Sequence, residues 1–169
     1  MIALAATAIF KAKAPQSAIN REFMQITSSS FKNSQPIPEK FTCDGEDINP
    51  ELAFADVPAN AQSLALIVHD PDAPSGDFTH WTVWNIVPDI SGIAENSAPQ
   101  GAVQGVTDFG RTGYSGPCPH NGSHHYHFTL YALDTVLDLG ASATKLDIEE
   151  AMDGHVLAKA ELIGVYEKK

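Results

Sequence analysis

The chain has 169 residues, of which 43% are hydrophobic and 18% are charged. This length and mixture predict one globular domain that can bury its own core, and they exclude an intrinsically disordered chain. The 21 Asp and Glu residues outnumber the 10 Lys and Arg residues, and the formal net charge of -11 disfavours nucleic acid as a partner. No apolar run reaches the ~20 residues of a membrane span, so we expect no stable membrane insertion.

The first 22 residues form a segment that we separate from a domain at residues 23–169. Residues 1–10 (MIALAATAIF) are apolar, and KAKAP follows them. Together they resemble the apolar core of a signal peptide and the small residues at its end. A basic leading stretch is missing, and Pro15 makes a poor cleavage point. A signal-peptide remnant and a packing arm both remain open, and the apolar run slightly favours a periplasmic over a cytoplasmic location.

Strand-length apolar segments alternate with loops rich in Gly, Pro, Asn and Asp along the domain. The clearest predicted strands are residues 62–69 (QSLALIVH), 80–87 (HWTVWNIV) and 124–133 (HHYHFTLYAL). Shorter strands are predicted at residues 24–28, 52–55, 102–106 and 161–166. The period of two places His124 and Tyr126 on one face of their strand and His125 and His127 on the other. It also places Trp81 and Trp84 on opposite faces, where we expect both to pack in the core.

One helix is predicted late in the chain. Asp147 can cap it, and Glu150 follows three residues on, as in a capping box. The apolar positions recur at intervals of four residues: Ile148, Met152 and Val156. We expect the helix to end near Ala160. Many strands, long irregular connections and a single helix predict a mainly β fold, an antiparallel β-sandwich with Greek-key links, and exclude a doubly wound α/β fold.

Polar side chains gather where the three clearest strands begin or end. Asp70 ends the first strand, His80 begins the second and His124 begins the third, so neighbouring strands would bring them to one rim. The loop at residues 110–122 (GRTGYSGPCPHNG) would close that rim, because its glycines permit close approach of backbone to a ligand. We expect Asp70 and Asp72 to orient the histidine rings and favour their protonated forms, which donate to a phosphate oxygen.

Other interpretations of these residues remain open. The DPDAP segment is also typical of an ordinary turn. His80, His124 and Asp70 could supply three zinc ligands, although no metal-binding motif with characteristic spacing is present. Cys118 could pair with a histidine as a nucleophile, although no helix start follows it to lower its pKa. Cys43 and Cys118 lie in separate loops, and a disulfide and two unbonded thiols are equally open.

Two long motifs, DPDAPSGDFTHWTVWN and GRTGYSGPCPHNGSHHYHFTLYALD, occur together with FTCDGEDINPELAF near the start and AMDGHVLAKAELIGVYEK near the end. On these motifs the chain, from about Met24, resembles the phosphatidylethanolamine-binding protein family in its bacterial and archaeal, Raf-kinase-inhibitor-like branch. The resemblance implies a large antiparallel sheet packed on a smaller one, with a pocket at the rim. It implies that the pocket takes phosphate or a phosphorylated head group, without a cofactor.

The resemblance also assigns ligand-binding residues by motif position. They are Asp70, Asp72, His80, Gly116, Pro117, His124 and Tyr126. Tyr126 would donate its hydroxyl near the pocket mouth, Gly116 and Pro117 would form a backbone wall, and the Ala73–Pro74 bond would be cis. The chain departs from the family pattern at three positions: Cys118 and His120, where proline is usual, and His125, where arginine is usual. The arginine's absence removes a fixed positive charge near the mouth.

Three function hypotheses follow. The first is a non-enzymatic binding protein for phosphate or a phosphorylated head group, with no catalytic residue and no metal. The second, also implied by the resemblance, is an inhibitor of a serine protease or kinase that acts through the surface around the pocket. The third is a minor hydrolase activity of the Asp, His and Cys side chains at the rim. By analogy with bacterial relatives we also expect a homodimer.

Overall fold

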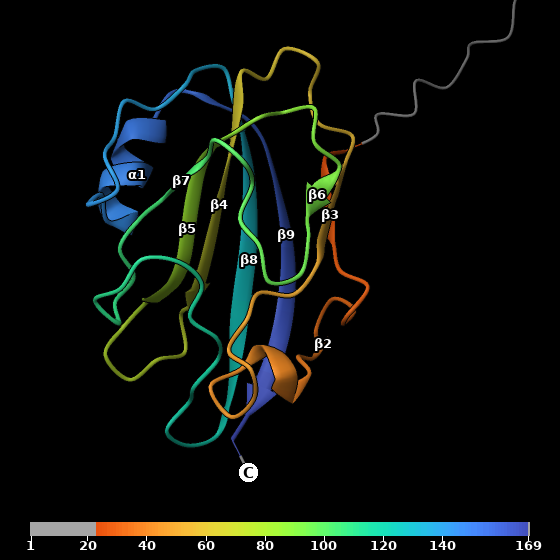
Figure 1. The fold of residues 1–169 in the computed structure, drawn as a ribbon, viewed down its shortest axis with the longest axis vertical. Coiled ribbons are helices and arrows are strands. Elements are labelled where there is room, and N and C mark those ends of the chain that lie inside the picture. The colour runs from red at the N-terminus through yellow and green to blue at the C-terminus, as the bar shows by residue number, and fades with distance from the viewer. Residues whose placement is uncertain (1–22, 169) are drawn as a thin grey trace, which may run out of the picture.

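The computed structural model describes residues 23–168, so the predicted segment at residues 1–22 lies outside the described residues. Within that range the strands form two sheets (Figure 1). The six-stranded sheet contains, in spatial order, β2 (Gln35–Pro36), β9 (Val156–Glu167), β8 (Ser123–Leu133), β4 (Ser63–Asp70), β5 (Phe78–Ile86) and β7 (Val103–Gln104). The three-stranded sheet contains β1 (Gln25–Thr27), β3 (Leu52–Ala55) and β6 (Gly92–Ile93). Every pairing is antiparallel except that of β2 with β9, which confirms the predicted mainly β sandwich.

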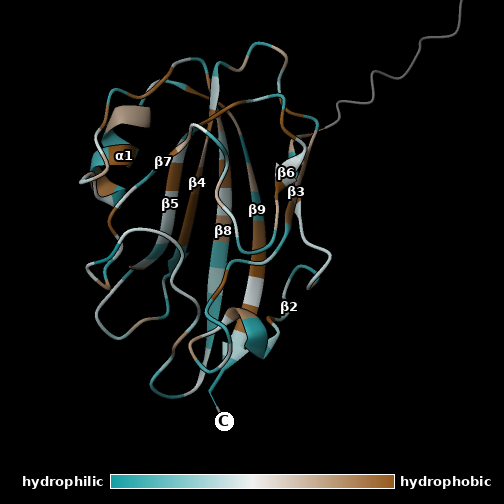
Figure 2. Ribbon diagram, viewed as in Figure 1, coloured by the Kyte–Doolittle hydropathy of each residue, from teal (hydrophilic) through white to brown (hydrophobic). Residues whose placement is uncertain are grey.

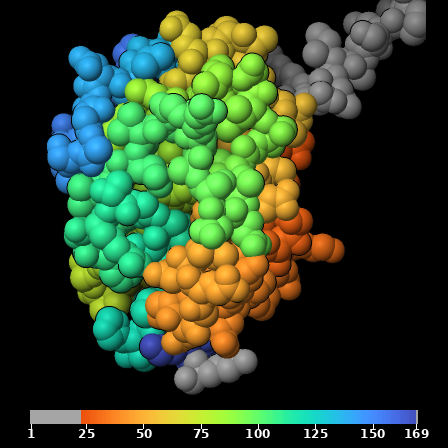
Figure 3. Space-filling view, in the orientation of Figure 1, coloured from red at the N-terminus to blue at the C-terminus, as the bar shows by residue number. Residues whose placement is uncertain are grey.

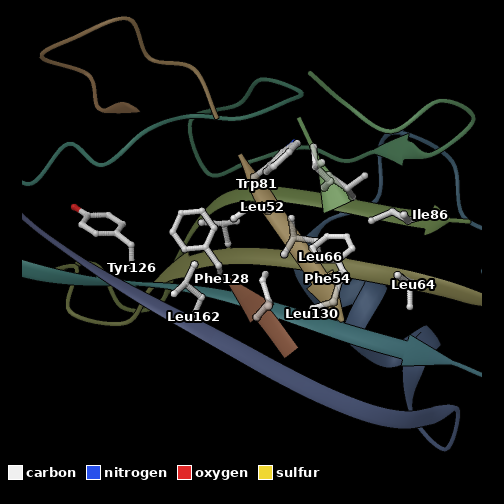
Figure 4. Close-up of a cluster of buried hydrophobic side chains, with 14 of the residues drawn as sticks. Leu52, Phe54, Leu64, Leu66, Trp81, Ile86, Tyr126, Phe128, Leu130 and Leu162 are labelled. Carbon is white, nitrogen blue, oxygen red and sulfur yellow. The ribbon is translucent and has the colours of Figure 1, made fainter. Parts of the chain in front are cut away.

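The main hydrophobic core fills the space between the two sheets. Alternation along β4 directs Leu64 and Leu66 into this core, where they meet Leu52 and Phe54 of the small sheet (Figure 4). Trp81 of β5 is buried in the same layer. The apolar area removed from water here is the main force that holds the sheets together.

A second core covers the opposite face of the six-stranded sheet. Ala65 and Ile67, which alternate with the residues of the main core, pack there with Trp84. The helix α1 (Lys145–Met152) covers them with Ile148 and Met152. Figure 1 shows α1 and the three-stranded sheet on opposite sides of the large sheet. The two tryptophans therefore lie in different cores, as their alternation predicts.

The helix is shorter than predicted, and its cap is a different residue. Thr144 is the N-cap and Asp147 is the third helical residue of the capping box, so the predicted cap at Asp147 was wrong. The helix ends at Met152 rather than near Ala160, because Gly154 adopts a positive φ of 78° and turns the chain away. The next residues pair with β8 instead, so that Ala160 lies opposite Leu130. No helix within residues 23–168 is long and apolar enough to cross a membrane.

The strands β4, β5 and β8 match the prediction within two residues at each end, whereas β9 begins at Val156, five residues before its predicted start at residue 161. The sequence did not indicate β2 and β6, which are two residues long, or the 3₁₀ turn η1 (Glu39–Phe41). Such short elements carry no periodicity, because a period of two needs at least four residues to be visible. They form where a neighbouring segment of backbone supplies hydrogen-bond partners. For example, the Ile37 N–H donates to the Val165 carbonyl at 2.7 Å.

Candidate functional site

A cavity of about 320 Å³ lies at the end of the large sheet where β4 ends and β5 and β8 begin. Such a volume is at the lower end of the range for small-molecule sites. Its polar lining includes Asp70, His80, His124 and Tyr126, so the structure brings these four predicted residues together. The other side chains around it are mostly apolar or aromatic: Ala73, Pro74, Phe78, Phe109 and Pro119. In Figure 2 the end of β8 beside this cavity is hydrophilic, whereas the strand centres are hydrophobic.

His124 is held by a buried carboxylate. Its Nδ1 lies 2.6 Å from Oδ2 of Asp70, on the neighbouring strand β4, and both side chains are largely excluded from water. A carboxylate accepts from a ring N–H, so this contact places the proton on Nδ1 and leaves Nε2 to face other groups. Asp70 is fixed in turn, because its Oδ1 accepts the backbone N–H of Asp72 at 2.9 Å.

His80 is held by a backbone carbonyl rather than by an aspartate. Its Nδ1 donates to the carbonyl oxygen of Ser115 at 2.7 Å, which also leaves Nε2 without a partner among the described residues. Aromatic rings surround the imidazole: the centroids of Phe78, Phe109 and Tyr126 lie 5.5, 5.4 and 5.1 Å from its own. Burial among these rings lowers the pKa of His80, although the Ser115 carbonyl and the charge of Asp70 act in the opposite direction.

Tyr126 lies between the two histidines and is more deeply buried than predicted. Its ring is stacked with that of His124 at 6.4 Å and meets that of His80 edge-on. Only 1% of its surface is exposed, and its hydroxyl has no hydrogen-bond partner within residues 23–168. Burial, with the charge of Asp70, raises the pKa of Tyr126, although the nearby backbone of Cys118 acts in the opposite direction, so the hydroxyl keeps its proton and can donate. The hydroxyl is therefore at the base of the cavity rather than at its mouth.

Asp72 has a different role from the one we predicted. Its carboxylate accepts from both the backbone N–H and the ring Nδ1 of His125, at 2.8 and 2.7 Å, in an exposed position where β4 ends and β8 begins. It orients neither His80 nor His124, and it does not line the cavity. The hydrogen bonds from His125 lower the pKa of Asp72. The expectation that both aspartates hold pocket histidines is thus wrong for Asp72 and correct for Asp70.

The corner after Asp70 forms with a trans Ala73–Pro74 bond, so the expected cis bond was wrong. Two hydrogen bonds close the turn without it: the Asp72 N–H to Asp70 Oδ1, and the Gly76 N–H to the Ala73 carbonyl at 2.9 Å. Gly76 has a positive φ of 101°, a conformation that glycine adopts without strain. The turn carries Ala73 and Pro74 into the cavity wall.

Gly116 and Pro117 do not line the cavity themselves; Cys118 and Pro119 do. Gly116 and Pro117 instead anchor the loop to the segment that contains Cys43 and Asp47. The Gly116 N–H donates to Asp47 Oδ1 at 2.6 Å, and the Pro117 carbonyl accepts the Cys43 N–H at 3.1 Å. A Cβ at position 116 would collide with the Phe41 carbonyl, so close backbone packing requires glycine there.

A disulfide joins Cys43 to Cys118, with the two Cα atoms 5.4 Å apart. It resolves the choice that the sequence left open, and it removes the free thiol that a Cys118 nucleophile would need. Arg111 adds a second tie between the same two segments, with Nη2 2.6 Å from Asp47 Oδ2. Figure 3 shows the segment near residue 45, in orange, packed against the green to teal loop that follows residue 105.

These contacts define what the cavity can do chemically. His80 and His124, whose Nδ1 atoms already have partners, line a small space together with His120, Tyr126 and mainly apolar walls. The Nε2 atoms accept hydrogen bonds when the rings are neutral and donate when they are protonated. Within residues 23–168, no group of three or more His, Cys, Asp or Glu side chains has the arrangement of a metal site. His80, His124 and Asp70 therefore do not form the three-ligand zinc site that the sequence left open.

The family model described as phosphatidylethanolamine-binding protein matches residues 27–167 of this chain. A UPF0098 protein of Methanothermobacter thermautotrophicus is 52% identical over 150 residues, which cover 86% of this chain and 99% of that protein. A UPF0098 protein of Pyrococcus abyssi is 50% identical and covers 88% of each chain.

Two solved structures are similar throughout. A putative phosphatidylethanolamine-binding protein homolog from Chlamydia trachomatis has a TM-score of 0.84 at 47% identity, over 87% of this chain and 99% of that one. The E. coli protein YbcL, described as a new member of the mammalian family of such proteins, has a TM-score of 0.82 at 31% identity, over 88% of this chain and 100% of that one.

Proposed function

Because this chain belongs to the phosphatidylethanolamine-binding protein family, we propose that it is a non-enzymatic protein that binds phosphate or a phosphorylated head group. The ligand's anionic group would lie between His80 and His124, above the hydroxyl of Tyr126. The observation that carries the proposal is the unpartnered Tyr126 hydroxyl, a buried donor between two imidazoles whose Nδ1 atoms are already occupied. A buried polar group without a partner costs about 1–3 kcal/mol, and a bound oxygen acceptor would recover that cost.

Binding of an anion here requires protons. The Asp70 carboxylate is close to the cavity, so a neutral His124 leaves a net negative charge that repels phosphate. Protonation of His124 cancels this charge, and protonation of His80 adds a second donor from its Nε2. Because burial lowers the pKa of His80, the free protein favours the neutral ring, and a bound anion would favour the protonated one. We therefore expect phosphate binding to be coupled to proton uptake.

The apolar walls of the cavity favour ligands whose anionic group carries an apolar or aromatic body. Phe78, Phe109, Pro74 and Pro119 present apolar surface on the way out of the cavity, and Phe109 remains 44% exposed. A phosphomonoester with a small apolar or aromatic body removes this surface from water, whereas inorganic phosphate does not. Phosphomonoesters should therefore bind more tightly than phosphate itself.

Titration calorimetry with phenyl phosphate and with inorganic phosphate at pH 6 tests this function. We expect saturable binding to the full chain, tighter for phenyl phosphate, and at least tenfold weaker binding to Tyr126→Phe. The His80→Ala, His124→Ala double variant should bind neither ligand. The matched control is His155→Ala, because His155 also pairs with an aspartate (Asp134, 2.8 Å) but lies in an exposed position outside the cavity.

Two outcomes would overturn the proposal. One is unchanged binding to the double variant, which would place the anion elsewhere on the protein. The other is release of phenol from phenyl phosphate in a manner that depends on His124, which would make the protein a hydrolase. Circular dichroism of each variant checks that a loss of binding does not reflect a loss of fold.

A further inference from the structure

A pair of histidines lies on the outer face of the large sheet, the face opposite to the cavity. His69 of β4 and His127 of β8 are direct partners in the antiparallel register, so their side chains project from the same face. Their ring centroids are 5.3 Å apart. Both side chains are about one-fifth exposed, at 20% and 22%. The sandwich core and the anion cavity use neither residue.

A carboxylate holds each ring from its outer side. Asp77 Oδ1 lies 2.5 Å from His69 Nδ1, and Glu161 Oε1 lies 3.2 Å from His127 Nδ1. Asp77 directly precedes β5 and Glu161 is in β9, so the two carboxylates flank the pair from opposite directions in the strand order β9-β8-β4-β5. Because a carboxylate contacts Nδ1 of each ring, Nε2 is the nitrogen that each ring has left for a ligand.

From this geometry we propose that His69 and His127 bind a divalent transition-metal ion of the Zn²⁺, Ni²⁺ or Cu²⁺ type through their Nε2 atoms. Two imidazoles that share a tetrahedral ion at ordinary metal–nitrogen distances have centroids about 5 Å apart, close to the spacing here. A carboxylate on the second nitrogen is the usual partner of a metal-bound histidine, because it fixes the tautomer and raises the basicity of the ligand. Water would complete the coordination, since the chain supplies two ligands.

The charges around the pair are suited to a cation. Asp77 contacts both His69 and Lys145, and Glu161 contacts both His127 and Thr129, so an acidic side chain lies on each side of the pair. Lys145 neutralises part of this charge, but it is itself shared with Glu149 at 2.7 Å.

Calorimetric titration of the full chain with Zn²⁺ at pH 7.5 tests this site. We expect one Zn²⁺ per chain, bound at least tenfold more weakly by His69→Ala and by His127→Ala. Glu161→Gln keeps both ligands and should weaken binding about tenfold, the lower end of the effect of such carboxylates. His155→Ala, which removes a carboxylate-paired histidine from another part of the surface, should bind as the unchanged protein does.

Electron paramagnetic resonance of the Cu²⁺ complex gives a second readout, which should show coupling to two imidazole nitrogens and to fewer in each single variant. His69→Gln and His127→Gln serve if an alanine variant does not fold. The absence of Zn²⁺ binding, or binding that neither histidine substitution weakens, would overturn the proposal. These residues are separate from His80 and His124, so the proposed anion function can fail while the metal site holds, and the reverse.

Discussion

The Nδ1 atom of His124 lies 2.6 Å from Oδ2 of Asp70, across two neighbouring strands and away from bulk water. This contact fixes both the orientation and the tautomer of a histidine that lines the cavity. A neutral pair carries the aspartate's negative charge, and a protonated pair carries none. Asp70 therefore determines how His124 is presented at this end of the sheet.

Asp70→Asn should weaken anion binding by about 10- to 100-fold, because the protonated His124 loses a charge-assisted hydrogen bond of about 1.5–3 kcal/mol, and we expect this loss to outweigh the removal of the repulsive aspartate charge. Sulfate is the suitable probe, since it remains a dianion between pH 5 and 8, and calorimetry at pH 6 gives its affinity. Asp134→Asn is the matched control, because Asp134 pairs with the exposed His155. Equal sulfate affinity in Asp70→Asn and the unchanged protein would contradict this role of Asp70.

His80 should make the protein less stable in mild acid. Burial lowers its pKa in the folded state, whereas the unfolded chain takes up the proton near the ordinary value of 6.5. The stabilisation from the neutral ring is present above pH 6.5 and is lost as the pH falls from 6.5 toward the folded-state pKa. Urea unfolding of the unchanged protein and of His80→Gln at pH 7.5, 6.5 and 5.5 measures how the free energy of unfolding depends on pH. We expect the smaller pH dependence in His80→Gln; identical dependence would argue against a lowered pKa.

His80 should also make sulfate binding depend on pH, in the opposite direction from the stability of the fold. A bound dianion raises the pKa of His80, so binding takes up a proton between the free and bound values. Sulfate affinity should therefore fall as the pH rises from 5 to 8. Calorimetry in two buffers with different ionisation enthalpies counts the protons directly. A count of zero across this range would show that the anion does not contact a titrating histidine.

The Cys43–Cys118 disulfide should add about 2–4 kcal/mol to the free energy of unfolding, since it closes a loop over a separation of 75 residues. Urea unfolding with and without reductant measures this contribution. The Cys43→Ala, Cys118→Ala double variant should unfold at the same urea concentration as the reduced protein, and reductant should not change that concentration. If oxidised and reduced protein unfold together, the bond does not stabilise the folded chain.

Gly116→Ala should destabilise the protein by about 1–3 kcal/mol, because the added methyl group has to displace backbone at Phe41 and Thr42. Gly140→Ala is the matched control: a Cβ there meets nothing within 4 Å, and Gly140 has no positive φ. Thermal unfolding of the two variants compares them. Similar melting temperatures would mean that the loop behind the cavity adapts at no cost.

The sequence was most informative about the long strands and the residues at their ends. Alternation in β8 placed His124 and Tyr126 on the buried face, and the cavity is lined from that face. The end of the helix was mispredicted because Val156 continues a helical spacing, while its actual partner, Leu133, is distant in the sequence. Local periodicity cannot show such a pairing, since strand partners are chosen by tertiary contacts.

The hydrogen-bond partners of the site were the least predictable part. The adjacent aspartates of DPDAP suggested one role for both, yet Asp70 binds the buried His124 and Asp72 the exposed His125. The Ser115 carbonyl that holds His80 has no sequence signal at all, because every residue has a backbone carbonyl. The His69–His127 pair was missed for a related reason: cross-strand register brings together residues that lie far apart in the chain.

The central claim is that an anion binds between His80 and His124, and a crystal structure with phenyl phosphate at pH 6 tests it most directly. The account predicts phosphate oxygens within hydrogen-bond distance of Nε2 of both histidines and of the Tyr126 hydroxyl, with the phenyl ring against Phe109. A phosphate bound elsewhere, or a cavity that holds only water at saturating ligand, would contradict it.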